Sequence, residues 1–203
     1  MIKKLSILAD GYVHCKSNFY TSTDVMNGKT IIFSTGVNKL VGDIDGGFWG
    51  ISYIISMFDE LKKNKDYFLE SIITTVNDKE FSISELSKQS CYLDETLYPL
   101  FYSKRKTVVQ LIAKGLKRSQ MDTTVDEVCN LFKLDSQRIH RPIYQVGNER
   151  FRAMAAVGYA FGKQVFCFPW LSKKMFDYYT NNILWLLDII ETLNLVAIVP
   201  VGK

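Results

Sequence analysis

Two consecutive helix–strand units near the C-terminal end constrain the fold of this chain most strongly. The alanine-rich stretch 148–160 places apolar residues at helical spacing, stops at Gly162 and runs into the apolar segment 164–168. A second apolar helix, 176–193, precedes the β-branched run 195–199. Helices that alternate with wholly apolar strands are typical of a parallel sheet covered on its faces, so this pattern predicts an α/β protein.

The first half of the chain predicts a strand, a glycine-rich loop, a helix and a hairpin. Residues 29–35 form a β-branched and aromatic run, the loop 36–50 is rich in glycine, and apolar residues recur at helical spacing over 51–58. The runs 70–76 and 81–83 flank a polar turn, as in an antiparallel hairpin. The sequence therefore predicts antiparallel strands beside the parallel ones.

The middle of the chain predicts helices. Apolar residues at spacings of three and four mark one helix around 108–112 and another around 125–132. Thr124 and Glu127 fit a capping box at the start of the second helix. With 203 residues, of which 47% are hydrophobic, we expect one domain over 1–203.

Composition excludes several classes of protein. A net charge of +4 is too small to indicate nucleic-acid binding by itself, and the four cysteines form no C-x-x-C pair. The histidines are isolated, so no metal site is expected. The apolar stretch 183–201 is interrupted by Asp188 and Glu191, which argues against a membrane span, and the N-terminus has no apolar run of signal-peptide length. We expect a cytoplasmic protein.

The order of elements resembles that of the ATP-binding cassette subunits of ABC transporters over nearly the whole chain. Tyr12 stands at about the position of that family's adenine-stacking aromatic residue, and 35–38 resembles the opening Gly-Pro-Asn of its phosphate loop. Residues 145–152 are similar to its signature stretch with the trailing arginine. The resemblance implies a P-loop-NTPase-like core with an antiparallel β subdomain and a helical subdomain at about 96–147.

The residues that carry chemistry in that family are altered here. The loop looks longer than the family's, and Phe-Trp at 48–49 or Gly-Ile at 50–51 stands where Lys-Ser is expected. Pro-Trp at 169–170 replaces the Asp and Glu that follow the second strand, and Asp-Glu at 94–95 falls where a glutamine belongs. Relative to the family, these changes predict no catalytic residues, no magnesium site and no required cofactor, and hence a chain that is not an enzyme.

The resemblance nevertheless nominates individual residues. Residual contacts with ATP would come from Tyr12, Gly36, Asn38, Gly46 and Gly47. The signature-like residues are Gly147, Asn148 and Glu149, and the candidates for an interface are Phe48, Trp49 and Trp170. Each has a structural alternative: Tyr12 as a half-buried aromatic residue, Asn148 as a helix cap, and the tryptophans as core residues.

The predicted function is that of a pseudo-ATPase, an accessory or regulatory partner of a bacterial ABC transporter, with peptide or bacteriocin export or immunity as the process. Its partners would be an ABC permease, an intact cassette or both, in a homo- or heterodimer that reaches the membrane only through the transporter. One alternative is a cassette that still binds nucleotide as a sensor or half-site. Another is a nucleic-acid-associated interaction protein, which the basic clusters 104–106, 117–118 and 173–174 would permit.

Overall fold

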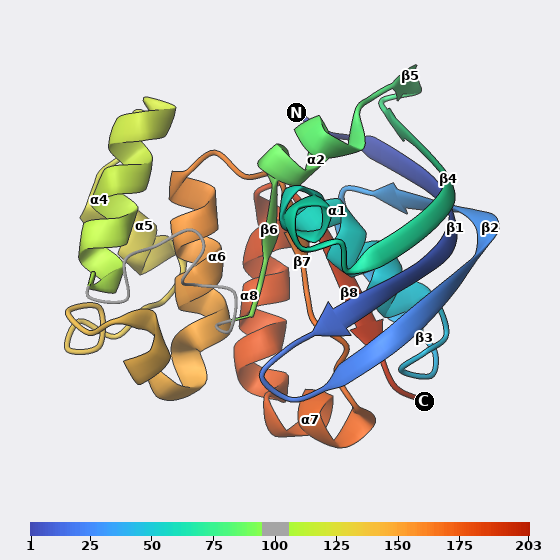
Figure 1. Ribbon diagram of the computed structural model, residues 1–203. Coiled ribbons are helices and arrows are strands. Elements are labelled where there is room, and N and C mark those ends of the chain that lie inside the picture. The colour runs from blue at the N-terminus through green and yellow to red at the C-terminus, as the bar shows by residue number, and fades with distance from the viewer. Residues whose placement is uncertain (95–105) are drawn as a thin grey trace.

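The computed structural model describes residues 1–94 and 106–203, which contain two four-stranded sheets surrounded by helices (Figure 1). The antiparallel sheet has the order β2-β1-β4-β5 and the parallel sheet the order β3-β8-β7-β6. The strands are β1 (Lys4–Lys16), β2 (Thr21–Ser34), β3 (Gly36–Val41), β4 (Tyr67–Val76), β5 (Lys79–Glu80), β6 (Ser90–Tyr92), β7 (Val165–Cys167) and β8 (Val196–Val201). The helices are α1 (Phe48–Asn64), α2 (Ile83–Gln89), α4 (Val108–Ser119), α5 (Val125–Leu131), α6 (Arg150–Ala160), α7 (Lys173–Tyr178) and α8 (Thr180–Thr192), with 3₁₀ turns η2 (Ile143–Gln145) and η3 (Gly147–Glu149).

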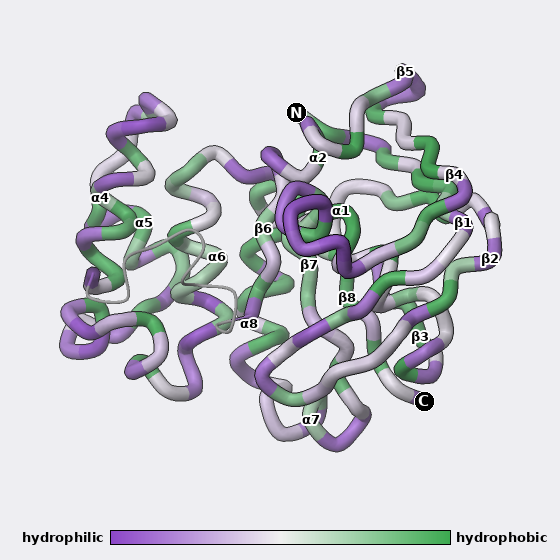
Figure 2. Tube along the Cα trace, viewed as in Figure 1, coloured by the Kyte–Doolittle hydropathy of each residue, from purple (hydrophilic) through white to green (hydrophobic). Residues whose placement is uncertain are grey.

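The two sheets bury their strands differently, and the sequence explains why. Every residue of β7 and β8 is buried, because helices cover both faces of the parallel sheet. Along β1, buried and more exposed residues alternate instead, since only one face of the antiparallel sheet meets the core. Figure 2 shows the same contrast between the hydrophobic β8 and the hydrophilic turn at β5.

Helix α1 lies between the two sheets and belongs to the core that joins them. Its apolar residues pack against the inner face of the antiparallel sheet and against β7 and β8. A second core on the opposite face of the parallel sheet contains α6 and α8 and extends into α4 and α5 (Figure 1). This arrangement of layers confirms the predicted α/β class, with an antiparallel sheet, a parallel sheet and a helical part.

Several predicted boundaries were wrong. Residues 29–34 of the predicted strand 29–35 are the second half of the antiparallel strand β2, and the predicted loop 36–50 contains the strand β3. Residues 81–83 are not a strand, and the predicted helix 176–193 is divided into α7 and α8. The helical subdomain at about 96–147 stays a prediction, and its first residues lie outside the described part of the chain.

Candidate functional site

The loop Gly42–Gly47 joins the C-terminal end of β3 to the start of α1. Its two end glycines have the G-x-x-x-x-G spacing of a phosphate-binding loop, and Phe48 and Trp49 occupy the next two positions, where that motif has Lys and Ser or Thr. Gly42 donates its N–H to the carbonyl of Val201 at 2.9 Å. The loop is therefore of ordinary length, because β3 accounts for the residues that made it look longer in the sequence.

Asp24 places its carboxylate at the start of α1. One oxygen accepts the N–H of Gly47 at 2.6 Å, and the other accepts the N–H of Gly50. Gly47 has a φ of 88°, and a Cβ atom there would lie 2.9 Å from the carbonyl oxygen of Val25. Glycine at position 47 is thus required for the close approach of β2 to the helix start.

The Asp24 carboxylate is wholly buried, and its surroundings shift its pKa in opposite directions. Burial raises the pKa of the carboxyl, while the N–H groups of Gly50 and Gly47 lower it. The negative charge of Asp45 raises that pKa further, and the net shift is upward. A buried carboxylate held by two backbone donors has the hydrogen-bonding pattern expected for an anion bound at a helix N-terminus.

Aromatic side chains pack beside this loop and at the start of α1. Trp49 is wholly buried and donates its Nε1–H to the hydroxyl of Tyr92 at 2.8 Å. Trp170 donates its Nε1–H to the carbonyl of Gly42 at 3.2 Å, and the ring of Tyr20 meets it edge-on with centroids 5.1 Å apart. Phe48 and Trp170 are half-buried and stay interface candidates. Trp49 belongs to the core instead, so its predicted role as a surface anchor was wrong.

The residues nominated for ATP contacts are not brought together. Gly46 and Gly47 lie in the loop, but Gly36 begins β3, so the whole length of that strand, about 17 Å at the usual rise per residue, separates Gly36 from the start of the loop. The side-chain amide of Asn38 donates hydrogen bonds to the carbonyls of Ser34, Gly36 and Ala197. Both residues therefore shape the start of the strand, and the sequence analysis misplaced them in the loop.

Tyr12 lies on the outer face of the antiparallel sheet. Its neighbours in β1 alternate in burial, with Val13 in the core, and the ring of Tyr12 stacks on that of Phe68 at 5.9 Å between centroids. Asp24, in contrast, points inward from the neighbouring strand. Tyr12 thus points away from the loop, and the aromatic residue joined to the loop through Trp170 is Tyr20.

The signature-like residues form the turn η3 immediately before α6. Gly147 adopts a φ of 64° and Asn148 is exposed. Glu149 accepts the N–H of Asp135 at 3.1 Å and lies within 3.7 Å of the guanidinium groups of Arg138 and Arg152. These contacts tie the turn to the helical part of the chain, while Asn148 stays accessible to a partner.

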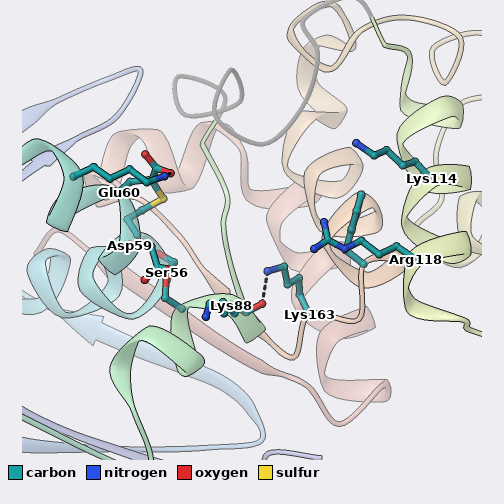
Figure 3. A pocket seen from close by; sticks show the side chains of 11 residues that line it. Ser56, Asp59, Glu60, Lys88, Lys114, Arg118 and Lys163 are labelled. Carbon is teal, nitrogen blue, oxygen red and sulfur yellow. Dashed lines mark hydrogen bonds and ion pairs between the residues drawn. The ribbon is translucent and has the colours of Figure 1, made fainter.

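A separate pocket of about 470 Å³ lies among α1, α2 and α4 (Figure 3). Lys114, Arg118 and Lys163 line one side, and Lys163 donates a hydrogen bond to the carbonyl of Lys88. Burial lowers the pKa of the Lys163 ammonium, and the charge of Arg118 lowers it further. The pocket adjoins the C-terminal half of the 17-residue helix α1, whereas the loop precedes its first residue, so the two are distinct.

Three further features concern metal ligands, membrane-spanning helices and basic clusters. No group of three or more His, Cys, Asp or Glu side chains among residues 1–94 and 106–203 could hold a metal ion. No helix in the described part of the chain is long and apolar enough to cross a membrane. The basic clusters 117–118 and 173–174 lie on separate helices, α4 and α7, and residues 104 and 105 lie outside the described residues.

Comparison with solved structures identifies the architecture. The chain aligns over 100% of its length with a bacterial Atm1-family ABC exporter with ATP bound, at a TM-score of 0.58 and 11% identity, and spans 35% of that chain. It also aligns over 100% of its length with CbiO1 from Clostridium perfringens, part of the ABC transporter complex cbiONQ. The TM-score is 0.58 and the sequence identity 10%, and this chain spans 79% of CbiO1. It aligns over 98% of its length with the ATP-binding cassette MJ0796, a dimer in a post-hydrolysis state bound to ADP and Pi. The TM-score is 0.61 and the sequence identity 10%, and this chain spans 88% of MJ0796. The fold is that of an ABC ATPase domain.

Sequence comparison adds no relative: no family model matches the chain, and no curated protein matches it. The structural neighbours nevertheless correct one prediction. The replaced motif residues predicted a chain that is not an enzyme, but the neighbours are ATP-binding cassettes, one of them in a post-hydrolysis state. The prediction of a non-enzyme was therefore wrong.

The residue that sequence reasoning missed is Asp24. The sequence signal for Asp24 is its position in β2, where residues that face the core alternate with exposed ones. Met26 and Phe33 are buried on the same face of this strand. A charged residue at an inward position must find partners, because burying an unpaired carboxylate is costly. Those partners, Gly47 and Gly50, are more than twenty positions away.

Proposed function

We propose that this chain is a cassette-type subunit that acts as an accessory or regulatory partner in an ABC transporter, paired with a permease, a second cassette or both. The single observation that carries the proposal is the alignment of 98–100% of the chain with ABC ATPase domains. The antiparallel sheet, the parallel sheet and the helical part occur together in one chain. The neighbours named above support a partner because they are an exporter, a member of a transporter complex and a dimer.

Two exposed segments, the loop Gly42–Gly47 and the turn η3, are the candidates for contact with a partner. Asp43, Asp45 and Gly46 are exposed in the loop, and Gly147 and Asn148 are exposed in the turn. In the family that the sequence resembles, the signature stretch of one subunit faces the phosphate loop of the other. We therefore expect the Asn148 turn of this chain to face the loop of its partner. Peptide or bacteriocin export or immunity stays a prediction about the process.

Co-purification tests this function directly. The chain is coexpressed with the products of neighbouring genes that encode a permease and a cassette, and the masses of the complexes are measured by light scattering across a concentration series. Asn148→Arg, which adds a long charged side chain on the exposed turn, should reduce retention of the partner at least tenfold. Asn64→Arg makes the same change at the exposed end of α1 and serves as the matched control.

The outcomes are decisive for the proposal. Retention by the wild type and by Asn64→Arg, but not by Asn148→Arg, supports a cassette-like partner contact. A chain that stays monomeric and retains neither gene product contradicts the proposal. Equal retention by both variants refutes the role of the turn η3.

A further inference from the structure

The pocket among α1, α2 and α4 is lined by more positive than negative side chains. Of the described residues that line it, five are cations and two are carboxylates, which leaves an excess of three positive charges. The whole chain carries a net charge of +4, so this one pocket holds most of the excess. Its volume of about 470 Å³ lies within the range of roughly 300–1,000 Å³ that small-molecule sites occupy.

The two carboxylates already have partners on their own side of the pocket. Glu60 forms an ion pair with Lys63 at 2.7 Å, and Asp59 accepts a hydrogen bond from the hydroxyl of Ser84 at 2.6 Å. Both acidic residues belong to α1 and lie across the pocket from the cations of α4 (Figure 3). The α1 side therefore does not neutralise the positive charge of the opposite wall.

That opposite wall is formed by Lys114, Arg118 and Lys163. No ion pair among residues 1–94 and 106–203 includes any of the three. Lys163 donates one hydrogen bond, to the carbonyl of Lys88, although its ammonium group has three N–H donors. Burial lowers the pKa of this ammonium and the charge of Arg118 lowers it further, whereas the Cys91 thiol acts in the opposite direction. The two cations thus repel each other, and a negative charge between them would relieve that repulsion.

Tertiary contacts hold this wall in place. Lys114 and Arg118 are four positions apart on α4, so they lie on the same face of the helix. Gly115 brings α4 against the end of α6, because a Cβ atom there would lie 2.9 Å from the carbonyl carbon of Ala160. The hydroxyl of Ser119 donates to the carbonyl of Ala160 at 2.8 Å. The chain leaves α6 at this point and leads into the segment that carries the third cation, so all three are positioned by one packed junction.

We propose that this pocket binds a small oxyanion with two or more negative charges, a phosphomonoester or a polycarboxylate, between Arg118 and Lys163, with Lys114 as a further cation. A guanidinium group presents paired N–H donors that match the oxygen atoms of either class, and an ammonium group supplies a compact charge. The pocket adjoins the C-terminal half of α1, so this site is separate from the loop Gly42–Gly47.

Isothermal titration of the purified full chain, at constant ionic strength, tests the proposal with pyrophosphate and citrate as probes. It compares the wild type with Arg118→Gln and with Lys117→Gln, which makes the same change of charge at an exposed position of α4 outside the pocket lining. Loss of a charge-assisted contact should weaken binding in Arg118→Gln by roughly tenfold or more, and Lys117→Gln should stay within about twofold of the wild type. The probe that binds more tightly identifies the phosphate or the carboxylate class.

Two results would overturn the proposal. One is a wild type that binds neither probe, and the other is binding that Arg118→Gln and Lys117→Gln change equally. The melting temperature provides a second measurement, because a ligand that binds the folded state stabilises it. The tighter probe should raise the melting temperature of the wild type and of Lys117→Gln and leave that of Arg118→Gln nearly unchanged at the same concentration. Equal increases in all three proteins would place the anion elsewhere.

This inference goes beyond the proposed transporter role and does not depend on it. Anion binding is measured on the isolated chain, whereas the transporter role is tested by retention of a permease or cassette. A chain that captures a partner but binds neither probe keeps its proposed function and loses the anion site.

Discussion

Replacement of Trp49 by phenylalanine tests whether this residue stabilises the core or serves an interface. The indole is wholly buried, and its Nε1–H donates to the Tyr92 hydroxyl at 2.8 Å. That hydroxyl also lies 3.4 Å from the carbonyl of Lys16, which is a long hydrogen bond. Trp49→Phe therefore removes the donor and leaves a buried hydroxyl with one weak partner.

The magnitude follows from two contributions. Loss of the hydrogen bond costs about 1 kcal/mol. Exchange of the indole for a smaller phenyl ring leaves a cavity that costs a further ~1–2 kcal/mol, less than complete removal of an aromatic side chain. We expect the free energy of unfolding to fall by about 2–3 kcal/mol, whereas an exposed interface residue would change the stability of the isolated chain by at most about 0.5 kcal/mol.

Urea unfolding followed by circular dichroism measures this difference. With a slope of roughly 2–3 kcal/mol per molar for a chain of this size, the midpoint should fall by about 1 M. The single variant Tyr92→Phe and the double variant complete a cycle in which the coupling energy between Trp49 and Tyr92 should be about 1 kcal/mol. An unchanged midpoint, together with an altered mass in light scattering, would refute the assignment of Trp49 to the core.

Three further predictions concern the loop and the helical part. Gly47→Ala should lower the free energy of unfolding by about 1–3 kcal/mol because of the positive φ of Gly47 and the nearby Val25 carbonyl. The control Gly46→Ala, at a glycine whose φ is not positive, should cost less stability. Equal urea midpoints for the two variants would contradict this reasoning. Thr124→Ala should cost about 1 kcal/mol in thermal unfolding through loss of the capping box, and an unchanged midpoint would refute that role. The Asp24 pKa is raised in the folded state, so its contribution to stability is present below about pH 4 and is lost as the pH rises through its folded pKa. Between pH 4 and 7 the wild type should therefore lose more stability than Asp24→Asn, and parallel pH profiles of the urea midpoint would contradict the raised pKa.

The elements that were predicted from the sequence are those whose signals are local. The capping box at Thr124 is present as predicted, and the apolar runs 164–168 and 195–199 contain the buried strands β7 and β8. Their hydrophobicity reflects burial on both faces and is readable within a few residues. The C-terminal helix was predicted as one because its apolar spacing continues across Tyr179, where the structure has the boundary between α7 and α8.

The early strands were harder to predict because their burial pattern is interrupted. The register of β1 and β2 shifts between Leu8 and Asp10, so alternation along β2 changes phase on either side of Gly28. The apolar second half of β2, 29–34, then looks like a complete strand, and the glycine at 36 looks like the start of the loop. This error moved Gly36 and Asn38 into the candidate site.

The first turn of α1 has no acidic residue, and the local sequence does not show which group accepts its first N–H groups. A helix that begins Gly-Phe-Trp-Gly, with no side chain of its own first turn able to cap it, leaves its first N–H groups to acceptors from another segment, from water or from a ligand. The sequence alone permits all three, and the resemblance to nucleotide-binding cassettes favours the ligand. The pairing of β1 with β2 sets the inward orientation of Asp24, and the close approach at Gly47 sets the distance. Because these two facts depend on tertiary contacts, the cap that Asp24 provides for α1 becomes visible only in the folded chain.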